Sequence, residues 1–314
     1  MSTAFVFPGQ GSQFVGMGRD MYEESQAARA IFDYADATLG FSLARLCFEG
    51  PEEILTATEN AQPALVTVCT ALLAALGDST DVSPVVGRWS SVVAGHSLGE
   101  YSALVAAGAL DFATALRLVR RRGELMAAAG EGAMAAIIGL DEAPLEALCH
   151  EASTEGAPVV IANYNSPGQL VISGAVTAVE QACALAKERG AKRALPLKVS
   201  AAFHSPLMRA AADSLASVVA DVPIADAHVP VLANVSAEPL FEADAIRREL
   251  AAQVTSAVRW IASVRHMTDA GVDTFVEVGP GAVLTGLIKR IAPGVQLVNI
   301  SDLASARSFL TERE

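Results

Sequence analysis

A serine in a glycine turn is the strongest sign of chemistry in this sequence. The segment Gly95-His96-Ser97-Leu98-Gly99 matches the G-x-S-x-G pattern of a nucleophile elbow, between the apolar run 90–95 and a helix-forming run over 100–108. There the serine hydroxyl would stand at the head of a helix, where the next main-chain N–H can help to bind an oxyanion. Small residues also cluster in plain turns, but the flanking strand and helix favour a nucleophilic Ser97.

A nucleophilic serine needs a base, and His204 is the best candidate. It follows the apolar triplet 201–203, where the chain returns from a differently patterned segment. The other four histidines lie beside the serine on a diverging turn or in polar or surface segments: His96, His150, His228 and His266. No Asp or Glu stands at the end of a core strand between Ser97 and His204, so a main-chain carbonyl could orient the imidazole in a Ser-His dyad.

Arg122 is expected to face the core. It lies in the middle of an apolar stripe formed with Ala115, Val119 and Met126, whose spacing is that of one helix face. Its neighbours Arg120 and Arg121 fall four and three residues before Glu124, where solvated ion pairs form. A core-facing arginine requires an anionic partner, which could be a buried carboxylate of the protein or the carboxylate of a ligand.

A second glycine turn follows the first apolar run, at residues 8–13. Its glycine spacing is neither that of a dinucleotide-binding loop nor that of a P-loop. It is either a tight turn without a ligand or a turn in which Gln10 offers a main-chain donor to Ser97. The four cysteines form no CxxC pair or cluster, which excludes a zinc ribbon and favours reduced thiols in the cytoplasm.

Composition limits the classes of protein that fit. The chain has 314 residues, 52% of them hydrophobic and 5% aromatic, with a net charge of −13, which argues against a nucleic-acid or anionic-membrane partner. Its most apolar stretches are interrupted before the roughly 20 residues of a membrane span. No basic leader precedes the first apolar run.

The order of expected elements indicates an α/β fold with an insertion. Strands are predicted near 4–7, 90–95, 229–234 and 274–278, and helices near 21–35, 61–76, 100–108 and 243–253, with a final helix after Gly281. Residues 131–199 instead predict the order β-α-β-β-α-β of a ferredoxin-like unit: strand 134–140, helix 142–152, strands 159–162 and 170–173, helix 177–189 and strand 193–199. We therefore divide the chain into a core of residues 1–130 and 200–314 and an insertion of residues 131–199.

Six ordered motifs resemble the malonyl-CoA:acyl-carrier-protein transacylases and the related acyltransferase domains of polyketide synthases. They span nearly the whole chain: FVFPGQGSQFVGMG at 5–18, GHSLGEYSAL at 95–104, RRGELM with GAMAAIIGL between 121 and 140, NSPGQLVISG at 165–174, AAFHSPLM at 201–208 and EVGPGAVLTGL at 277–287.

This resemblance implies an α/β-hydrolase-like core with a ferredoxin-like insertion, and a role for each site residue. Ser97 matches the nucleophile, His204 the base, and Arg122 the arginine that holds the malonyl carboxylate. Gln10 and Leu98 match the donors of the oxyanion hole, and a main-chain carbonyl orients the histidine. Two further matches lie near the cleft: Asn163 and Gln169. The implied reaction is ping-pong transfer of malonyl from malonyl-CoA to an acyl carrier protein, without metal or bound cofactor.

The acyl group and the carrier are further expectations. The bulk of Phe203 beside His204 would crowd an α-methyl branch, so malonyl is expected over methylmalonyl. The carrier could serve fatty acid synthesis or a polyketide line in trans, and a serine (thio)esterase is the rival activity. Because acyl carrier proteins are acidic, a local basic cluster is expected at the docking site, from Lys192, Arg193, Lys198, Arg209, Lys289 and Arg290.

Overall fold

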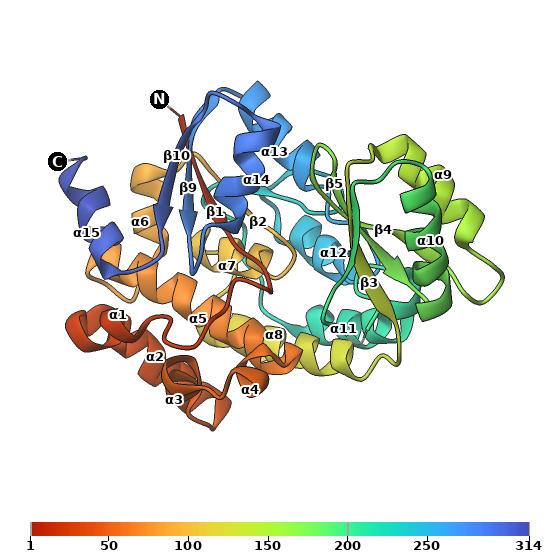
Figure 1. Cartoon of the computed structure of the whole chain (residues 1–314). Coiled ribbons are helices and arrows are strands. Elements are labelled where there is room, and N and C mark those ends of the chain that lie inside the picture. The colour runs from red at the N-terminus through yellow and green to blue at the C-terminus, as the bar shows by residue number, and fades with distance from the viewer. Residues whose placement is uncertain (1, 200, 314) are drawn as a thin grey trace.

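Two separate sheets form the framework of the chain, whose computed structural model describes residues 2–199 and 201–313 (Figure 1). The larger sheet has the strand order β10-β9-β1-β2-β7-β8. Its neighbouring strands run parallel except for the β7–β8 pair. Its strands are β1 (Ser2–Phe7), β2 (Val92–Gly95), β7 (Val231–Leu232), β8 (Pro239–Leu240), β9 (Val272–Val278) and β10 (Gln296–Ile300).

Helices cover both faces of this sheet (Figure 1). The N-terminal half contributes α1 (Arg19–Glu24), α2 (Gln26–Leu39), α3 (Leu43–Glu49), α4 (Glu52–Thr56), α5 (Thr58–Gly77), α6 (Ser83–Trp89), α7 (Gly99–Ala106) and α8 (Phe112–Ala127). The C-terminal part contributes a short 3-10 turn (Pro206–Met208), α11 (Arg209–Asp221), α12 (Ala243–Gln253), α13 (Trp260–Asp269), α14 (Val283–Ile291) and α15 (Leu303–Thr311).

The central strand β1 explains why the sheet needs both layers. Successive side chains of a strand point to opposite faces. Phe5 and Phe7 enter the core formed with α2, α5 and α15, whereas Ala4 and Val6 enter the core formed with α13 and α14. A strand buried on both faces is typical of a parallel sheet, and its apolar sequence follows from that position.

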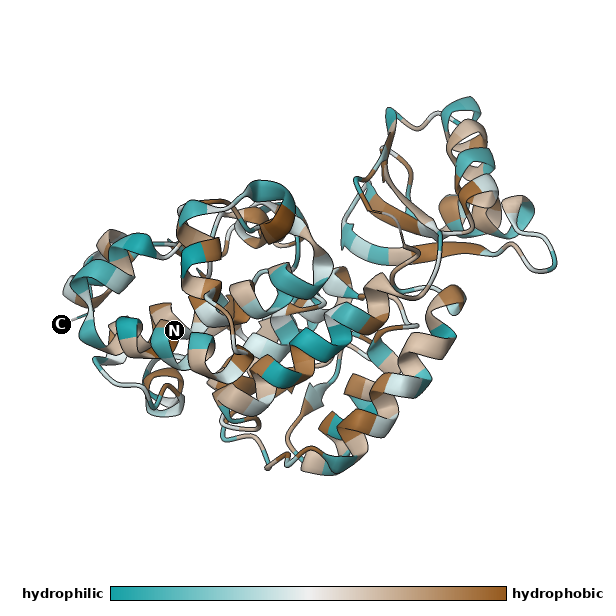
Figure 2. Cartoon of the chain, turned by 90° about the horizontal axis from the view of Figure 1, so that it is seen from below, coloured by the Kyte–Doolittle hydropathy of each residue, from teal (hydrophilic) through white to brown (hydrophobic). Residues whose placement is uncertain are grey.

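The smaller sheet stands apart from the larger body (Figure 2). It is antiparallel, in the order β4-β5-β3-β6, with β3 (Ala133–Ile138), β4 (Val159–Ser166), β5 (Gln169–Gly174) and β6 (Arg193–Pro196). Helices α9 (Glu142–Ala152) and α10 (Val176–Glu188) pack on one face and complete the expected β-α-β-β-α-β order. The predicted α/β class with an additional antiparallel sheet is confirmed, while the division at residues 131 and 199 stays a prediction.

One sequence expectation is wrong. The helix after Gly281 does not end the fold, because α14 is followed by edge strand β10 and by α15. Most of β10 is only half-buried, so it lacks the continuous apolar run that marks the inner strands. Helix α5 has 20 residues and is apolar enough to span a membrane by length and composition, but 83% of its most apolar window is buried inside the protein. Burial explains its composition, since a helix hydrophobic all round belongs in a core.

The turn between β2 and α7 has no room for a side chain at its glycines. A Cβ on Gly99 would lie 2.1 Å from the Phe7 carbonyl oxygen, and one on Gly95 would lie 1.9 Å from the Gly99 carbonyl carbon. Only glycine at these positions lets the head of α7 approach the ends of β1 and β2 so closely.

We expect Gly99→Ala to lower the free energy of unfolding by about 1–3 kcal/mol or more, because the added methyl group must displace backbone. The matched control is Gly286→Ala in α14, where a Cβ meets no atom within 4 Å. This control should be neutral or stabilising by up to about 1 kcal/mol. Urea unfolding of both variants measures the difference, and equal stabilities would contradict the close-packing argument.

Candidate active site

The structure brings Ser97 and His204 together from segments 107 residues apart. Ser97 lies between β2 and α7, and its hydroxyl is 2.7 Å from Nε2 of His204. Both residues have left-handed backbone angles, with φ of 50° at Ser97 and 58° at His204. Non-glycine residues in this region are strained, and such strain persists only where the surroundings hold it.

Main-chain carbonyls orient the histidine. Nδ1 of His204 lies 3.0 Å from the carbonyl oxygens of both Gln253 and Ser256. Two acceptors at Nδ1 require the proton there, which leaves Nε2 as the acceptor facing the Ser97 hydroxyl. A carbonyl therefore stands where an acidic residue would complete a triad, as the absence of a suitable Asp or Glu from the sequence indicated.

The imidazole is held in its neutral, basic form. Burial, and after it the nearby positive charge of Arg122, lower the pKa of His204 to about 3. Desolvation and a like charge both disfavour the imidazolium ion. His204 is thus unprotonated across the physiological range and ready to accept the serine proton.

Arg122 faces the core, as its helical spacing predicted, and is 1% exposed. Its guanidinium donates to the side-chain oxygens of Gln62 and Gln253, each at 2.8 Å, and to the Ser97 hydroxyl at 3.2 Å. It also lies 5.4 Å from the centre of the Tyr101 ring. Within the described residues it forms no ion pair, so of the two partners considered above, the carboxylate of a ligand is favoured.

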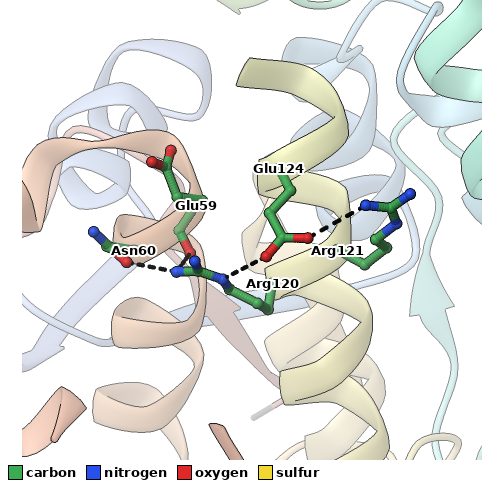
Figure 3. Close-up of polar contacts among 5 residues, drawn as sticks. All are labelled: Glu59, Asn60, Arg120, Arg121 and Glu124. Carbon is green, nitrogen blue, oxygen red and sulfur yellow. Dashed lines mark hydrogen bonds and ion pairs between the residues drawn. The ribbon is translucent and has the colours of Figure 1, made fainter. Parts of the chain in front are cut away.

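Figure 3 shows that the two neighbouring arginines both reach Glu124. Arg120 and Arg121 both pair with Glu124, at 2.9 and 3.4 Å, as predicted. Arg120 also donates to the side chain of Asn60 at 2.6 Å and to the main chain of Glu59 at 3.1 Å, which ties α8 to the start of α5. Of the three consecutive arginines, only Arg122 reaches the nucleophile.

Gln10 and Leu98 lie where oxyanion donors are expected. Both line the cavity that contains Ser97. Neither main-chain N–H donates a hydrogen bond to any other described residue, so both remain available to an oxyanion. The Gln10 side chain donates instead to Thr58 at 3.1 Å, which fixes its loop against α5.

A cavity of about 370 Å³ surrounds the nucleophile. Phe203, which is 8% exposed, and Asn163 line it. Gln169 does not, because its side-chain oxygen accepts a hydrogen bond from Arg290 on α14. Among residues 2–199 and 201–313, no cluster of His, Cys, Asp and Glu could hold a metal ion.

Sequence reasoning missed three residues that hold the nucleophile turn: Asn234, Gln253 and Glu100. The Asn234 side chain accepts from the Ser97 N–H and donates to the Gly95 carbonyl, both at 2.7 Å. Gln253 could have been found from spacing, since it follows Ile246, Glu249 and Leu250 on the buried face of α12. Asn234 gives only the weak signal of a polar residue after an apolar run.

The lowered pKa of His204 predicts a pH-dependent contribution to stability. The unfolded state takes up the proton near pH 6.5, whereas the folded state resists protonation down to about pH 3. Stability is therefore complete above pH 6.5 and falls as the pH is lowered. Between pH 7 and 5 the wild-type protein should lose up to about 2 kcal/mol more than His204→Asn, a replacement that tolerates a positive φ. Urea unfolding at both pH values measures this, and parallel losses would contradict the burial argument.

Comparison with known proteins agrees with this geometry. Residues 4–306 match the family described as acyl transferase domain. The malonyl CoA-acyl carrier protein transacylase of Bacillus subtilis is 50% identical over 95% of this chain and 93% of its own, and that of Escherichia coli K12 is 49% identical over 92% of both.

Solved structures agree in fold over nearly the whole chain. The acyl-carrier-protein S-malonyltransferase of Bartonella henselae has a TM-score of 0.95 at 43% identity, over 99% of both chains. A malonyl-transacylase in complex with a type II PKS acyl-carrier protein has a TM-score of 0.93 at 42% identity, over 99% of this chain and 100% of its own. Sequence, fold and the arrangement around Ser97 lead to one conclusion: the chain belongs to the acyl transferase family of the malonyl CoA-acyl carrier protein transacylases.

Proposed function

We propose that this protein transfers malonyl from malonyl-CoA to the phosphopantetheine thiol of an acyl carrier protein through a malonyl-Ser97 intermediate. One observation carries the proposal. A buried guanidinium, which forms no ion pair with the residues that the structure describes, lies 3.2 Å from the hydroxyl of a serine that is hydrogen-bonded to a neutral histidine. A nucleophile beside a fixed cation suits an acyl group that carries its own carboxylate.

The first half-reaction forms the acyl-enzyme. Oγ of Ser97 attacks the thioester carbonyl carbon while its proton passes to Nε2 of His204. The tetrahedral oxyanion is stabilised by the main-chain N–H groups of Gln10 and Leu98. The bond between carbon and sulfur then breaks, and the leaving CoA sulfur takes the proton from His204.

The second half-reaction repeats these steps with the carrier. The pantetheine thiol gives its proton to His204 and its sulfur attacks the ester carbonyl of malonyl-Ser97. The Ser97 oxygen leaves and recovers the proton, so the enzyme returns to its starting state. Arg122 pairs with the malonyl carboxylate throughout, and the reaction as proposed needs neither a metal nor a bound cofactor.

The walls of the cavity support the selection of malonyl. The Phe203 ring lies next to His204 along the chain and lines the cavity beside the nucleophile. An α-methyl branch on the acyl group would need the space that this ring fills, so malonyl is favoured over methylmalonyl. Asn163, 6% exposed, adds a polar group to the same wall.

The carrier is acidic and this chain has a net charge of −13, so docking must rely on local cations. All six cations of the expected cluster are exposed: Lys192, Arg193, Lys198, Arg209, Lys289 and Arg290. Lys198 lines the cavity itself, and Arg290 reaches Gln169 on the smaller sheet. We propose that the carrier approaches over this part of the surface.

We propose the supply of extender units for fatty acid synthesis as the biological role. A discrete acyltransferase that serves a polyketide synthase is the second candidate, favoured by the similar structure bound to a type II PKS carrier. Assays with both kinds of carrier distinguish the two roles. A cytoplasmic location is proposed on the four free cysteines, three of them buried.

Loss of the nucleophile tests the intermediate. Incubation of the wild-type protein with malonyl-CoA alone should add one malonyl group to its intact mass, and Ser97→Ala should add none. Continuous release of CoA without carrier, with no stable adduct, would instead support a (thio)esterase. Ser102→Ala, at a buried serine of α7, is a control that should still acquire the adduct.

Removal of the cation tests acid recognition. We expect Arg122→Ala to reduce malonyl loading by at least a hundredfold, because a buried charge-assisted pair is lost. Acetyl loading should fall far less, since acetyl has no carboxylate. Loading rates with malonyl-CoA and acetyl-CoA measure the ratio. Equal losses for the two substrates would contradict the role of Arg122.

A further inference from the structure

A buried carboxyl group that takes no part in the acyl transfer lies close to the nucleophile. Glu100 is 1% exposed and begins the first turn of α7, three residues after Ser97. One of its oxygens accepts from the main-chain N–H of Asn234 at 2.9 Å. The other accepts from the side-chain amide of Gln253. Burying a carboxyl group is costly, so these two bonds call for an explanation.

The first bond fixes the segment that holds the nucleophile turn. Asn234 uses both ends of its side-chain amide on this turn, accepting from the N–H of Ser97 and donating to the carbonyl of Gly95. These contacts hold Ser97 at its positive φ. Because Glu100 accepts a hydrogen bond from the main-chain N–H of Asn234, it fixes the position of Asn234 relative to the nucleophile turn.

The second bond fixes a residue that contacts three parts of the site. The Gln253 amide nitrogen donates to the Ser97 carbonyl at 3.0 Å, and its amide oxygen accepts from Arg122 at 2.8 Å. Its main-chain carbonyl accepts from His204. The orientation of one amide group therefore decides whether Arg122 meets an acceptor or a donor.

Glu100 determines that orientation because each of its two carboxyl oxygens accepts a hydrogen bond from an N–H group, one from Asn234 and one from Gln253. It draws the NH2 end of the Gln253 amide toward itself, which turns the oxygen toward Arg122. Both of its oxygens are used, one for each N–H partner. A glutamine at this position has only one oxygen, so it could satisfy one of the two donors but not both.

We propose that Glu100 is a positioning residue for malonyl recognition: by accepting from Asn234 and Gln253 at once, it fixes the nucleophile turn and keeps the Gln253 oxygen on Arg122. This inference rests on the proposed function. It assigns Glu100 no contact with the substrate, because its effect passes through Gln253 and Asn234.

A second carboxyl group beside it provides a matched control. Glu249 accepts from the N–H of Val235, the residue after Asn234, at 2.8 Å. Burial raises the pKa of both glutamates, and the neighbouring negative charge of Glu249 raises that of Glu100 further. A pair of buried carboxyl groups favours sharing one proton.

The experiment compares Glu100→Gln with Glu249→Gln, measuring malonyl and acetyl loading rates and urea unfolding. In Glu100→Gln the single side-chain oxygen of the new glutamine accepts from the fixed main-chain N–H of Asn234. Its NH2 group then faces the Gln253 side chain, and the Gln253 amide must rotate so that its oxygen accepts from this NH2 group instead of from Arg122. We expect kcat/KM for malonyl loading to fall at least tenfold and the malonyl-to-acetyl ratio at least threefold. Glu249→Gln keeps an oxygen that can accept from the N–H of Val235. Its kcat/KM for malonyl loading should stay within threefold of the wild-type value, with the malonyl-to-acetyl ratio unchanged.

If Glu100 had only a structural role, Glu100→Gln would lower the fraction of active protein and would reduce the malonyl and acetyl loading rates equally. Equal losses, or malonyl loading within threefold of wild type, would overturn the proposal. If Glu100→Gln fails to fold, Gln253→Met replaces it, since this variant removes the side-chain amide and keeps the carbonyl that holds His204. A fall of at least threefold in the malonyl-to-acetyl ratio of this variant supports the proposal, and malonyl loading at the wild-type rate overturns it. Failure of the proposed function is separate, because wild type would then form no malonyl adduct.

Discussion

A permanent positive charge buried beside the nucleophile is the constraint around which the site is built. The Arg122 guanidinium cannot shed its proton at neutral pH, and removing it from water without a counter-charge costs free energy. The protein offsets part of that cost with neutral groups: the amide oxygens of Gln62 and Gln253 and the face of the Tyr101 ring. A guanidinium solvated only by neutral groups retains a strong preference for an anion, which under the proposed function the carboxylate of the substrate would supply.

The nucleophile depends on a different constraint, which is the space between two strands and a helix. Gly95 and Gly99 let the head of α7 touch the carbonyl ends of β1 and β2, so Ser97 must turn sharply and adopts a positive φ. His204 has the same strained conformation, and its N–H is bonded to the Val254 carbonyl at 3.1 Å. Hydrogen bonds from the C-terminal half of the chain hold both residues, so the dyad exists only once that half has packed.

Sequence patterns predicted the parts of this arrangement that depend on local periodicity. The spacing of α8 placed Arg122 on the buried face, and α9 and α12 begin and end where they were expected. The glycine turn identified Ser97, and elimination identified His204. The roles of Asn234 and Glu100 could not be predicted because each acts through partners more than a hundred residues away. The sequence did not predict β10 because a half-exposed edge strand lacks a clear apolar pattern, and it did not predict β8 because two residues are too few to show one.

Recognition and activation are coupled through the charges of the site. In the empty site the positive charge of Arg122 helps to hold the pKa of His204 far below its ordinary value, which makes the imidazole a weak base. Under the proposed function, a malonyl carboxylate paired with Arg122 would cancel much of that charge, so the pKa of His204 would rise as the thioester arrives at Ser97. A neutral acyl group would bring no such change and would meet a weaker base. The same guanidinium would therefore select acid-bearing substrates twice, once through binding and once through the strength of the base that activates the nucleophile.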